Sequence, residues 1–275
     1  MYEPLYLPKM KKVNILSGNV SYAISYSKKY KDLKSNEIES LHMHGYTEFF
    51  FSLSNDISFF VDGKLYSVGV GEAIVSLANE IHVCNFNKPK SYEYFCFWVE
   101  ADNPCILECI PKSKSLSFDE DTKDRLFSLL FQLNSLTEKE DEFESSVVFL
   151  QVLEILKNSH QKNYSKTAFP EEFQQILNYI NENFLEIKTV KDIADKFFIS
   201  STTLLRSFNK YLNITPRKYL EQVKLSLAVE LLNKGETVTD ACLNSGFSDV
   251  SHFIVLFKKK FSVSPFKYKE RRKKF

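Results

Sequence analysis

Residues 246–268 read GFSDVSHFIVLFKKKFSVSPFKY, and residues 200–219 read SSTTLLRSFNKYLNITPRKY. The two stretches match at one constant spacing, which pairs Leu204 with Phe253, Phe208 with Phe257, Ile214 with Val263, Pro216 with Pro265, Lys218 with Lys267 and Tyr219 with Tyr268. Internal similarity of this kind is most simply explained by two copies of one supersecondary unit. The repeat therefore predicts that the C-terminal third of the chain folds as two matching helical halves.

Each copy has the pattern of a helix-turn-helix. A short helix is predicted over 190–197 in the first copy and over 238–244 in the second, and a small residue in each, Ala194 or Cys242, lets the next helix cross closely. A tight turn follows, with Gly246 in the second copy, and then a helix with one apolar face. The other face of that helix is free to enter the major groove of DNA, where all base pairs can be distinguished.

The residues predicted to reach DNA lie on the outward faces of these second helices. The predicted base contacts are Ser201, Thr202, Thr203, Leu205 and Arg206 in the first copy, and Asp249, Val250, Ser251, His252 and Val255 in the second. The predicted phosphate contacts are Arg217, Lys218, Lys258, Lys259, Lys260 and Lys267, with the basic tail 269–274. Arginine can bond guanine twice, and lysine neutralises phosphates. For any single residue the alternative is a solvated surface charge, and for the whole set it is a helical domain that binds other proteins.

The charge distribution agrees with a polyanionic partner. The chain carries 36 Lys+Arg and 35 Asp+Glu, a net charge of +1, but the basic excess falls within residues 166–275, whereas residues 119–165 are acidic. A basic surface confined to one end of a protein is where nucleic acid is expected to bind.

These residues resemble the AraC/XylS family of bacterial transcription regulators. The similarity covers about residues 171–272, and its most specific part is Gly246-Phe247-Ser248-Asp249 with Phe253, Phe257-Lys258, Ser264-Pro265 and Tyr268. The resemblance implies a DNA-binding domain of two helix-turn-helix units joined by a long helix, expected here over 216–233, that binds double-stranded promoter DNA. It further implies a homodimer, most often an activator that contacts RNA polymerase.

The second unit departs from the family pattern. Val255 stands where the family often has an arginine, His252 where an aromatic residue is usual, and Cys242 where alanine is usual. The second recognition helix therefore lacks its usual guanine reader. Base specificity is expected to depend more on Arg206.

Short alternating runs fill the N-terminal part of the chain. The strands are predicted at EFFFSL (48–53), ISFFV (57–61), KLYSV (64–68), AIVSL (73–77) and the aromatic-rich run 92–99, with Asp62-Gly63 as a hairpin signal. Several short strands at regular spacing predict a β-sandwich or a β-barrel.

Alternating histidines mark a candidate ligand site in this part. His42 and His44, with Glu48 after three intervening residues, have the spacing of a cupin metal motif, and His82 lies where the last histidine of a cupin is expected. Residues two apart on a strand point the same way, so both early histidines can face a barrel interior. The surrounding motif is incomplete, with Asn55, Leu77 and Asn79 in place of the usual glycine, proline and glycine.

Three interpretations of this site remain open. The favoured one is an organic-ligand pocket for a small molecule such as a sugar, because pockets of this kind combine aromatic walls with a few polar groups. Its predicted ligand-binding residues are His42, His44, Glu48, His82, Tyr66 and Trp98, with Phe49, Phe51, Phe59, Tyr94 and Phe97 as further lining. The second is a divalent iron, manganese or zinc ion held by the three histidines and Glu48, and the third is a remnant that only packs. No cofactor, metal or catalytic residue is predicted, and a cupin enzyme with a helical appendage is the alternative class.

Two helices are predicted between the strands and the repeat. Leucines recur at helical spacing over 126–136, and a second apolar stripe follows the acidic break 138–144. Helix 141–158 is predicted to form a dimer seam through Phe143, Val147, Leu150 and either Leu153 or the neighbours of Glu154. The equal alternative is that these helices only pack on the barrel.

We therefore predict an α+β multidomain protein. A cupin-like, effector-sensing β-barrel is expected over 1–118, a helical dimerisation segment over 119–165, and an all-α double helix-turn-helix domain over 166–275. The predicted function is activation of transcription in response to a small-molecule effector, with a ligand-independent regulator as the alternative. Five cysteines without a Cys-x-x-Cys pair, no signal-peptide pattern and no apolar stretch long enough to span a membrane predict a cytoplasmic location.

Overall fold

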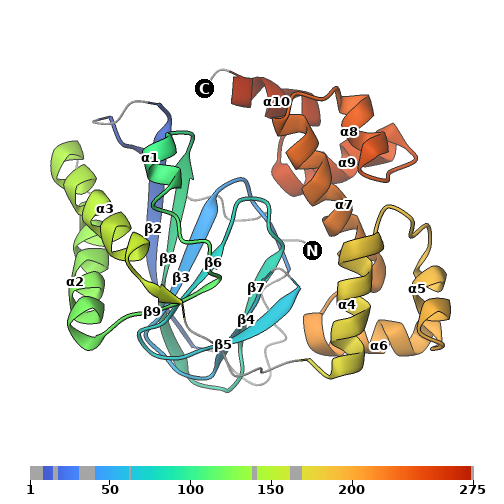
Figure 1. Ribbon diagram of the computed structural model, residues 1–275, viewed down its shortest axis with the longest axis horizontal. Coiled ribbons are helices and arrows are strands. Elements are labelled where there is room, and N and C mark those ends of the chain that lie inside the picture. Colours follow the sequence, from blue (N-terminus) through green and yellow to red (C-terminus); the bar gives the residue numbers. More distant parts are fainter. Residues whose placement is uncertain are drawn as a thin grey trace.

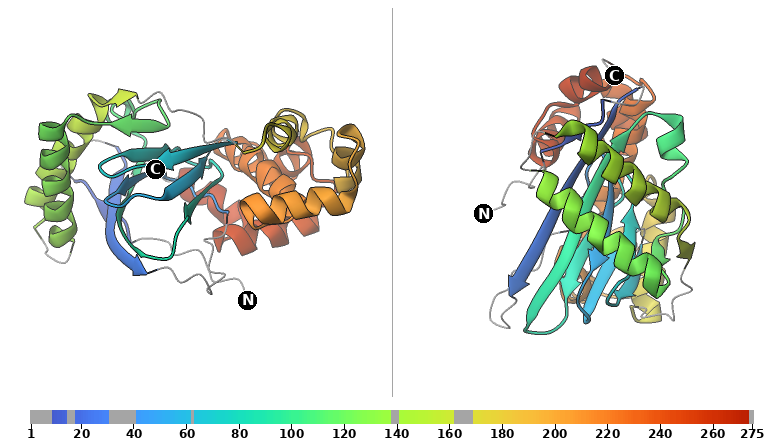
Figure 2. Two further views of the ribbon diagram at one scale, coloured as in Figure 1. Left: turned by 90° about the horizontal axis from the view of Figure 1, so that it is seen from below. Right: turned by 90° about the vertical axis from the view of Figure 1, so that its left-hand side faces the viewer.

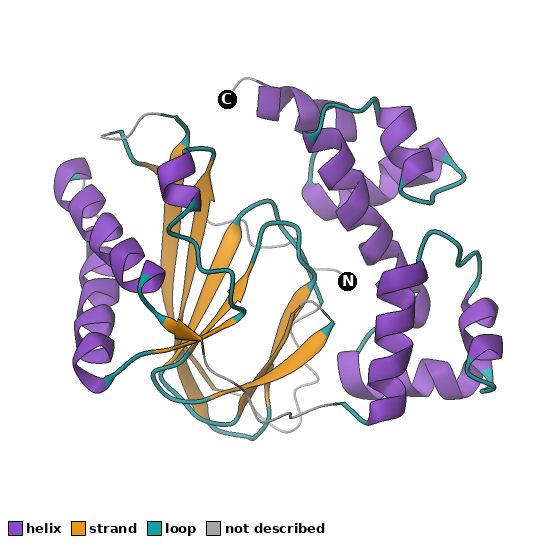
Figure 3. Cartoon of the chain, viewed as in Figure 1, coloured by secondary structure: helices purple, strands orange, loops and turns teal. Residues whose placement is uncertain are grey.

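The computed structural model describes residues 9–14, 18–30, 41–61, 63–137, 141–161 and 169–273. Asp62 of the expected hairpin, residues 138–140 of the acidic break, the expected linker 162–168 and Lys274 lie outside the described residues. Two layers of β-sheet form the middle of the molecule, with a helix pair against one side and a larger helical domain on the other (Figure 1). The prediction of an α+β multidomain architecture is confirmed (Figure 3).

The N-terminal strands form two antiparallel sheets. The larger sheet has the order β1-β2-β8-β3-β6-β9-β10, and the smaller has the order β5-β4-β7. The strands are β1 (Lys11–Lys12), β2 (Val20–Tyr30), β3 (Thr47–Ser52), β4 (Ile57–Val61), β5 (Lys64–Val68), β6 (Ala73–Ser76), β7 (His82–Phe86), β8 (Ser91–Ala101), β9 (Ser115–Ser117) and β10 (His160–Gln161). Within the described residues the expected barrel is thus a two-sheet sandwich, and an isolated bridge pairs His42 with His82 of β7.

Both faces of the larger sheet are covered, which explains the unbroken apolar run in β3. Phe49 and Phe51 point toward the helix pair, whereas Phe50, between them, packs on Phe59 of the smaller sheet with ring centroids 5.3 Å apart. Alternate side chains of a strand point to opposite faces of its sheet. The expectation that Phe49, Phe51 and Phe97 line a pocket between the sheets is therefore wrong, because all three face the helices.

Helices α2 (Glu120–Leu136) and α3 (Glu142–Lys157) lie across the outer face of this sheet (Figure 2). Phe149 of α3 is fully buried there and stacks on Tyr22 of β2 at 4.9 Å between ring centroids. Leu153 is also buried, whereas Phe143 is 70% exposed. Much of this segment therefore belongs to the core of the sandwich, and only part of the predicted seam is open to solvent.

The C-terminal domain is helical throughout its described residues. Its helices are α4 (Glu171–Asn183), α5 (Val190–Lys196), α6 (Ser201–Leu212), α7 (Pro216–Asn233), α8 (Val238–Asn244), α9 (Val250–Phe261) and α10 (Pro265–Lys273), and the N-terminal part adds the short α1 (Pro104–Leu107). Within the described part of the chain, no helix has the length and apolar character that crossing a bilayer requires.

Hydroxyl and carboxylate side chains fix where these helices begin. Thr189 and Asp192 form a capping box at α5, Ser200 caps α6, Thr237 caps α8 and Asp249 caps α9. A capping side chain accepts a hydrogen bond from a backbone N–H that has no partner within the helix. Ser200, Thr237 and Asp249 thus fix the starts of α6, α8 and α9.

The repeat is visible in the backbone. Asn213 and Ser262, which end α6 and α9, both adopt the left-handed conformation, with φ of +52° and +58°. In the two turns, Phe198 has φ of +53° where Gly246 has +84°. Glycine carries no steric penalty in this conformation. The first unit therefore makes the same turn with a phenylalanine, whose side chain is 97% exposed.

Phe208→Ala is expected to lower the free energy of unfolding of the C-terminal domain by about 3–5 kcal/mol, because it leaves a cavity in the core. Phe208 is fully buried and packs against Phe173 and Tyr219. Urea denaturation measures the change. Phe198→Ala is the matched control and is expected to change stability by less than about 0.5 kcal/mol, as is usual for surface positions. Equal losses in the two variants would contradict this packing.

Candidate DNA-binding and ligand-binding sites

The first recognition helix, α6, presents the predicted base contacts on one side. Leu204, Phe208 and Leu212 are buried against the domain core. The predicted contacts Ser201, Thr202, Thr203, Leu205 and Arg206 are all exposed. Thr203 is partly engaged, since its backbone N–H donates to Ser200 Oγ at 3.0 Å. Arg206 has no such structural role among the described contacts, and its side chain is exposed to solvent.

The second recognition helix, α9, presents a different surface. Ser251 and Val255 are exposed, with Val255 at 66%, whereas Val250 is half-buried and packs on the domain core. Asp249 is exposed but caps the helix by accepting from the His252 backbone N–H at 3.0 Å. His252 is half-buried, and its Nε2 is buried with no hydrogen-bond partner among the described residues. His252 is thus less available to bases than its sequence position indicates.

The outward face of α9 carries exposed apolar side chains. Ile254 is 36% exposed beside Val255, and sequence reasoning did not single it out. Its position between the buried Phe253 and the outward Val255 is the signal that would have found it. Apolar side chains in the major groove contact the methyl group of thymine.

The predicted phosphate contacts divide into two groups. Arg217, Lys218, Lys258, Lys259 and Lys267 are exposed, and Arg217 Nε lies 3.0 Å from Glu221 Oε1. Lys260 is different, because burial lowers the pKa of its ammonium to about 8. In the expected basic tail, Lys269 Nζ instead donates to the carbonyls of Gly235 and Glu236 at 2.8 and 2.7 Å. Lys269 of the tail therefore has a structural role within the domain.

A buried lysine holds the two helix-turn-helix units together. Lys224 of α7 is 9% exposed, and its Nζ donates to the carbonyl of Ile187 at 3.1 Å and to that of Gly246 at 3.0 Å. Ile187 precedes α5, and Gly246 forms the turn of the second unit. Burial lowers the pKa of Lys224. One ammonium group thus ties both units to the linking helix.

The second site is the histidine cluster of the sandwich. The ligand atoms of His42, His44, Glu48 and His82 all lie within 4.8 Å of one another. Glu48 Oε2 is 2.8 Å from His44 Nε2 and 3.4 Å from His82 Nε2. His44, Glu48 and His82 are 4%, 6% and 1% exposed. The structure therefore brings together four residues that the sequence predicted to share a site.

The other ring nitrogens of two histidines bind protein oxygens. His44 Nδ1 is 3.0 Å from the carbonyl of Tyr46, and His82 Nδ1 is 2.9 Å from the carbonyl of Glu80 and 2.8 Å from Ser76 Oγ. A carbonyl only accepts, so each Nδ1 carries the proton and each Nε2 turns toward Glu48. Nε2 of His82 is buried and has no hydrogen-bond partner among the described residues.

The electrostatics of the cluster follow from its burial. Burial lowers the pKa of His44, which disfavours its charged form. Burial alone would raise the pKa of Glu48, but the adjacent His44 and His82 hold the pKa of this carboxyl well below its usual range. The cluster is thus a buried carboxylate faced by imidazole nitrogens.

The two aromatic residues predicted for this site fall in different places. Trp98 of β8 is buried, and its Nε1 donates to Glu48 Oε2 at 2.8 Å. Tyr66 of β5 is half-buried and packs at the edge of the cluster formed by Phe50, Phe59 and Tyr94 between the sheets. Trp98 therefore belongs to the histidine cluster, whereas Tyr66 pairs across the small sheet with Phe59.

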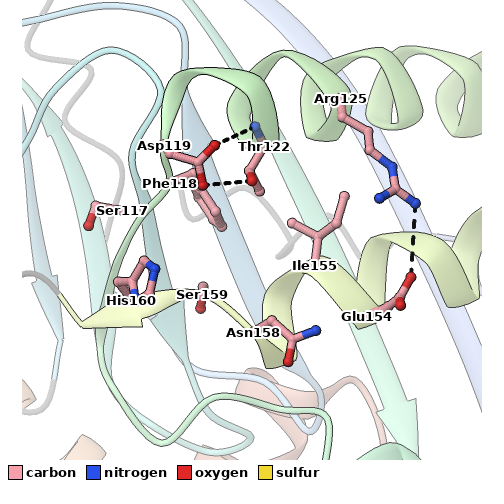
Figure 4. A pocket seen from close by; sticks show the side chains of 10 residues that line it. All are labelled: Ser117, Phe118, Asp119, Thr122, Arg125, Glu154, Ile155, Asn158, Ser159 and His160. Carbon is pink, nitrogen blue, oxygen red and sulfur yellow. Dashed lines mark hydrogen bonds and ion pairs between the residues drawn. The ribbon is translucent and has the colours of Figure 1, made fainter.

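A pocket is lined by residues of α2, α3, β9 and β10 on the outer side of the sandwich (Figure 4). Its polar groups have structural partners: Asp119 accepts from the Thr122 backbone N–H at 2.9 Å and caps α2, and Arg125 lies 3.9 Å from Glu154 (Figure 4). It contains none of the residues predicted to bind a ligand. We assign it no function.

Comparisons with known proteins agree with the geometry of the C-terminal domain. Residues 193–271 match a family model described as a helix-turn-helix domain. The chain is 24% identical over 241 residues to the HTH-type transcriptional activator RhaR of Mannheimia succiniciproducens, covering 84% of this chain and 87% of that protein. It is 34% identical over 121 residues to the HTH-type transcriptional activator RhaS of Escherichia coli O157:H7, covering 43% of each, so it spans less than half the length of the RhaS relatives.

A solved structure of ToxT from Vibrio cholerae aligns with 90% of this chain and with 97% of the ToxT chain, at 11% identity and a TM-score of 0.37. Two helix-turn-helix units that expose their second helices define a DNA-binding transcription regulator. These matches agree with the resemblance of residues 171–272 to the AraC/XylS family.

Lys224→Met is expected to lower the free energy of unfolding by roughly 1–3 kcal/mol, because methionine keeps the apolar stem but leaves two buried carbonyls without their donor. Chemical denaturation measures the loss. Lys234→Met, at the residue that caps the C-terminus of α7, is the control, since its exposed ion pair with Glu230 contributes little. If both variants unfolded at the parent's denaturant midpoint, Lys224 would not link the units.

Proposed function

We propose that this protein binds promoter DNA sequence-specifically through α6 and α9, and that a small ligand in its N-terminal domain changes its affinity for DNA. The observation that carries the proposal is the pair of recognition helices, whose outward residues are exposed while their inward residues are buried. The two units that carry these helices are both bonded to one helix, α7, through Lys224. The relatives named activators support activation through RNA polymerase, in the cytoplasm where promoter DNA lies.

The two units read DNA by different chemistry. In α6, Arg206 bonds guanine through its guanidinium, and Thr202 contacts a neighbouring base or phosphate. In α9, Ile254 and Val255 pack on thymine methyl groups and Ser251 adds a hydrogen bond. We propose that the first unit selects a G·C pair and the second a run rich in A·T pairs.

Phosphate contacts keep α6 and α9 in position on the duplex. Arg217 and Lys218 at the start of α7 and Lys258 and Lys259 at the end of α9 are exposed basic residues near the recognition helices. Contacts of this kind position a protein on the duplex without reading its sequence. They also make the affinity fall with salt.

The ligand is proposed to bind at the histidine cluster, with His42, His44, Glu48, His82 and Trp98 as its contacts. This cluster is a set of converging polar groups inside the sandwich, next to the surface that touches the DNA-binding domain. Tyr66 is not part of this cluster and belongs to the aromatic packing between the sheets. Such a setting suits a ligand that is recognised by a few polar groups.

Homodimerisation is proposed through the exposed end of α3. Phe143 is 70% exposed and Val147 38% exposed on this helix, and Leu150 is half-buried. Leu153 is buried against the sheet and is therefore left out of the proposed seam. Pairing of two chains brings two DNA-binding domains to paired sites, which raises the effective concentration of the second domain.

Arg206→Ala is expected to weaken binding to a DNA site selected from a random pool by about 10–100-fold and to relax specificity at one base pair. Lys258→Ala is expected to weaken binding to all sequences alike and to reduce the slope of log affinity against log salt by about one. Fluorescence anisotropy over a salt series measures both effects.

Arg125→Ala is the control for these variants, because this exposed arginine lies on α2, on the other side of the sandwich from the DNA-binding domain (Figure 1). It is expected to leave affinity and salt slope unchanged. Parental affinity in the Arg206→Ala variant would contradict the proposed reading by α6.

Phe143→Asp is expected to weaken self-association by at least about tenfold, since it places a charge in an apolar contact. Sedimentation at several concentrations measures the dimer dissociation constant. Leu107→Asp is the control, because Leu107 is an apolar residue of α1 that is 49% exposed and is not part of the proposed seam. Self-association that is equally sensitive to both substitutions would place the contact elsewhere.

A further inference from the structure

The smaller sheet of the sandwich faces the helical domain (Figure 1). A short backbone ladder extends this side, where the N–H of His42 donates to the carbonyl of His82 at 2.9 Å and the N–H of His82 donates to the carbonyl of His42 at 2.8 Å. Because side chains alternate along paired strands, the neighbours of these two histidines point to the opposite face. We call that face the bridge face, and it carries four apolar residues, Leu41, Met43, Ile81 and Val83.

The two helix-turn-helix units have separate cores. The first half of α7, up to Val223, contributes to the core of the first unit, and the second half, from Leu225 onward, contributes to the core of the second. Between them, Lys224 bonds to one carbonyl of each unit. A lysine has a flexible four-carbon stem, so these two bonds do not by themselves fix the tilt of one unit against the other.

The bridge face is divided between the two cores. Leu41 and Val83 are buried in the core of the first unit, and Met43 is buried in the core of the second. Ile81 is half-buried, and among the described apolar residues it alone packs against both cores. A side chain wedged between two packed bodies resists their relative movement, because a tilt would open a void in a close-packed interior.

Hydrogen bonds from α7 to the sandwich lie on either side of this joint. Gln222, two residues before Lys224, donates from Nε2 to the carbonyl of Leu41 at 3.1 Å. Ser226, two residues after Lys224, donates from Oγ to the carbonyl of Asn79 at 2.6 Å. The sandwich therefore holds α7 both where it leaves the first unit and where it enters the second.

The recognition residues stay open in this arrangement. Arg206 of α6 and Val255 of α9 are exposed while the sandwich is packed against α7. Two readers held at a fixed angle bind a matching DNA site more tightly than two flexible ones, because less ordering entropy is lost on binding. Packing of the sandwich thus favours one spacing of the two DNA segments.

We propose that the sandwich sets the angle between α6 and α9 by packing Ile81 into the joint between the two helix-turn-helix units. This inference rests on the proposed function, because it concerns how the two recognition helices reach neighbouring grooves. Ile81 is a positioning residue, since it acts through the recognition helices and not on the bases. The N-terminal domain is thereby part of the device that reads DNA, and it determines which spacing of the two segments the protein accepts.

The proposal is tested with the full chain and three DNA duplexes. The first is the site selected from a random pool, the second has two base pairs inserted between the segments read by α6 and α9, and the third has the α9 segment scrambled. The insertion displaces the second segment by about 7 Å and rotates it by about 70° around the duplex. The parent is expected to bind the inserted site at least about tenfold more weakly than the selected site, because its joint is stiff. Fluorescence anisotropy measures each affinity.

Ile81→Ala is expected to lower this spacing ratio about fivefold or more, because a looser joint loses preorganisation for the selected site and lets α9 follow the displaced segment. Its affinity for the scrambled duplex is expected to stay within about twofold of the parent's, since Ile81 and the contacts of α6 are independent. This comparison separates a change of angle from a loss of folding. Ile81→Val, which shortens the side chain by one carbon, is expected to keep most of the ratio.

Ser226→Ala is a second, milder probe of the joint, because it removes the bond to Asn79 and leaves the apolar cores intact. It is expected to lower the spacing ratio at least about twofold. Val70→Ala is the control, since Val70 is 50% exposed between β5 and β6 and is not among the residues that pack against either helical core. Its spacing ratio is expected to equal the parent's.

The outcomes separate this inference from the proposed function. A parental spacing ratio in Ile81→Ala would overturn the inference, and so would an equal loss of affinity for all three duplexes. For an Ile81→Ala chain that does not fold, the ratio in Ser226→Ala decides in the same way. A parent that selects no DNA site contradicts the proposed function, whereas a parent that binds its site in an Arg206-dependent manner and accepts the inserted site equally well contradicts only the present inference.

Discussion

Helix α7 is the constraint on which the arrangement of the C-terminal domain depends. It runs from Pro216 to Asn233, which at about 1.5 Å per residue is a rod of about 27 Å. Both helix-turn-helix units pack on this rod, and Lys224 in its middle bonds to a carbonyl from each. Because successive major grooves on one side of DNA are about 34 Å apart, a linker of this length and stiffness limits the units to neighbouring grooves.

The same helix is also the surface to which the N-terminal domain is attached. Met43 and Leu41 are buried on one side of α7, and Gln222 and Ser226 bond to backbone carbonyls of the sandwich. These contacts leave Arg206 and Val255 exposed. Docking of the sandwich therefore does not cover the residues proposed to read bases.

The helical domain was largely predictable because its signals are local. Thr189, Ser200 and Asp249 precede apolar periodic runs, and Gly246 marks a left-handed turn, so the helix boundaries follow from capping and turn chemistry. The functions of His252 and Lys269 were not predictable in this way. Lys269 is bound to carbonyls at the end of α7, and the ring of His252 turns inward, which are contacts between segments that the spacing along one helix does not reveal.

The sandwich was predictable in class but not in detail. In β3, Phe49, Phe50 and Phe51 are all buried, because helices cover one face of the sheet and the second sheet covers the other. Where both faces are apolar, the period of two that tells inside from outside is lost. The histidine cluster escaped this ambiguity, since polar residues at alternate positions mark their common face even in a buried strand.

Met43 shows that an apolar residue inside a polar motif can form a contact between two domains. It lies between His42 and His44, whose rings join the histidine cluster. An isolated bridge pairs His42 with His82 of β7, whereas the fully buried side chain of Met43 lies in the core of the second helix-turn-helix unit. A methionine between two histidines of the cluster is fully buried here because the helical domain covers that face. The alternation that builds the histidine cluster thus also builds the interface with α7, and a change of register would disrupt both.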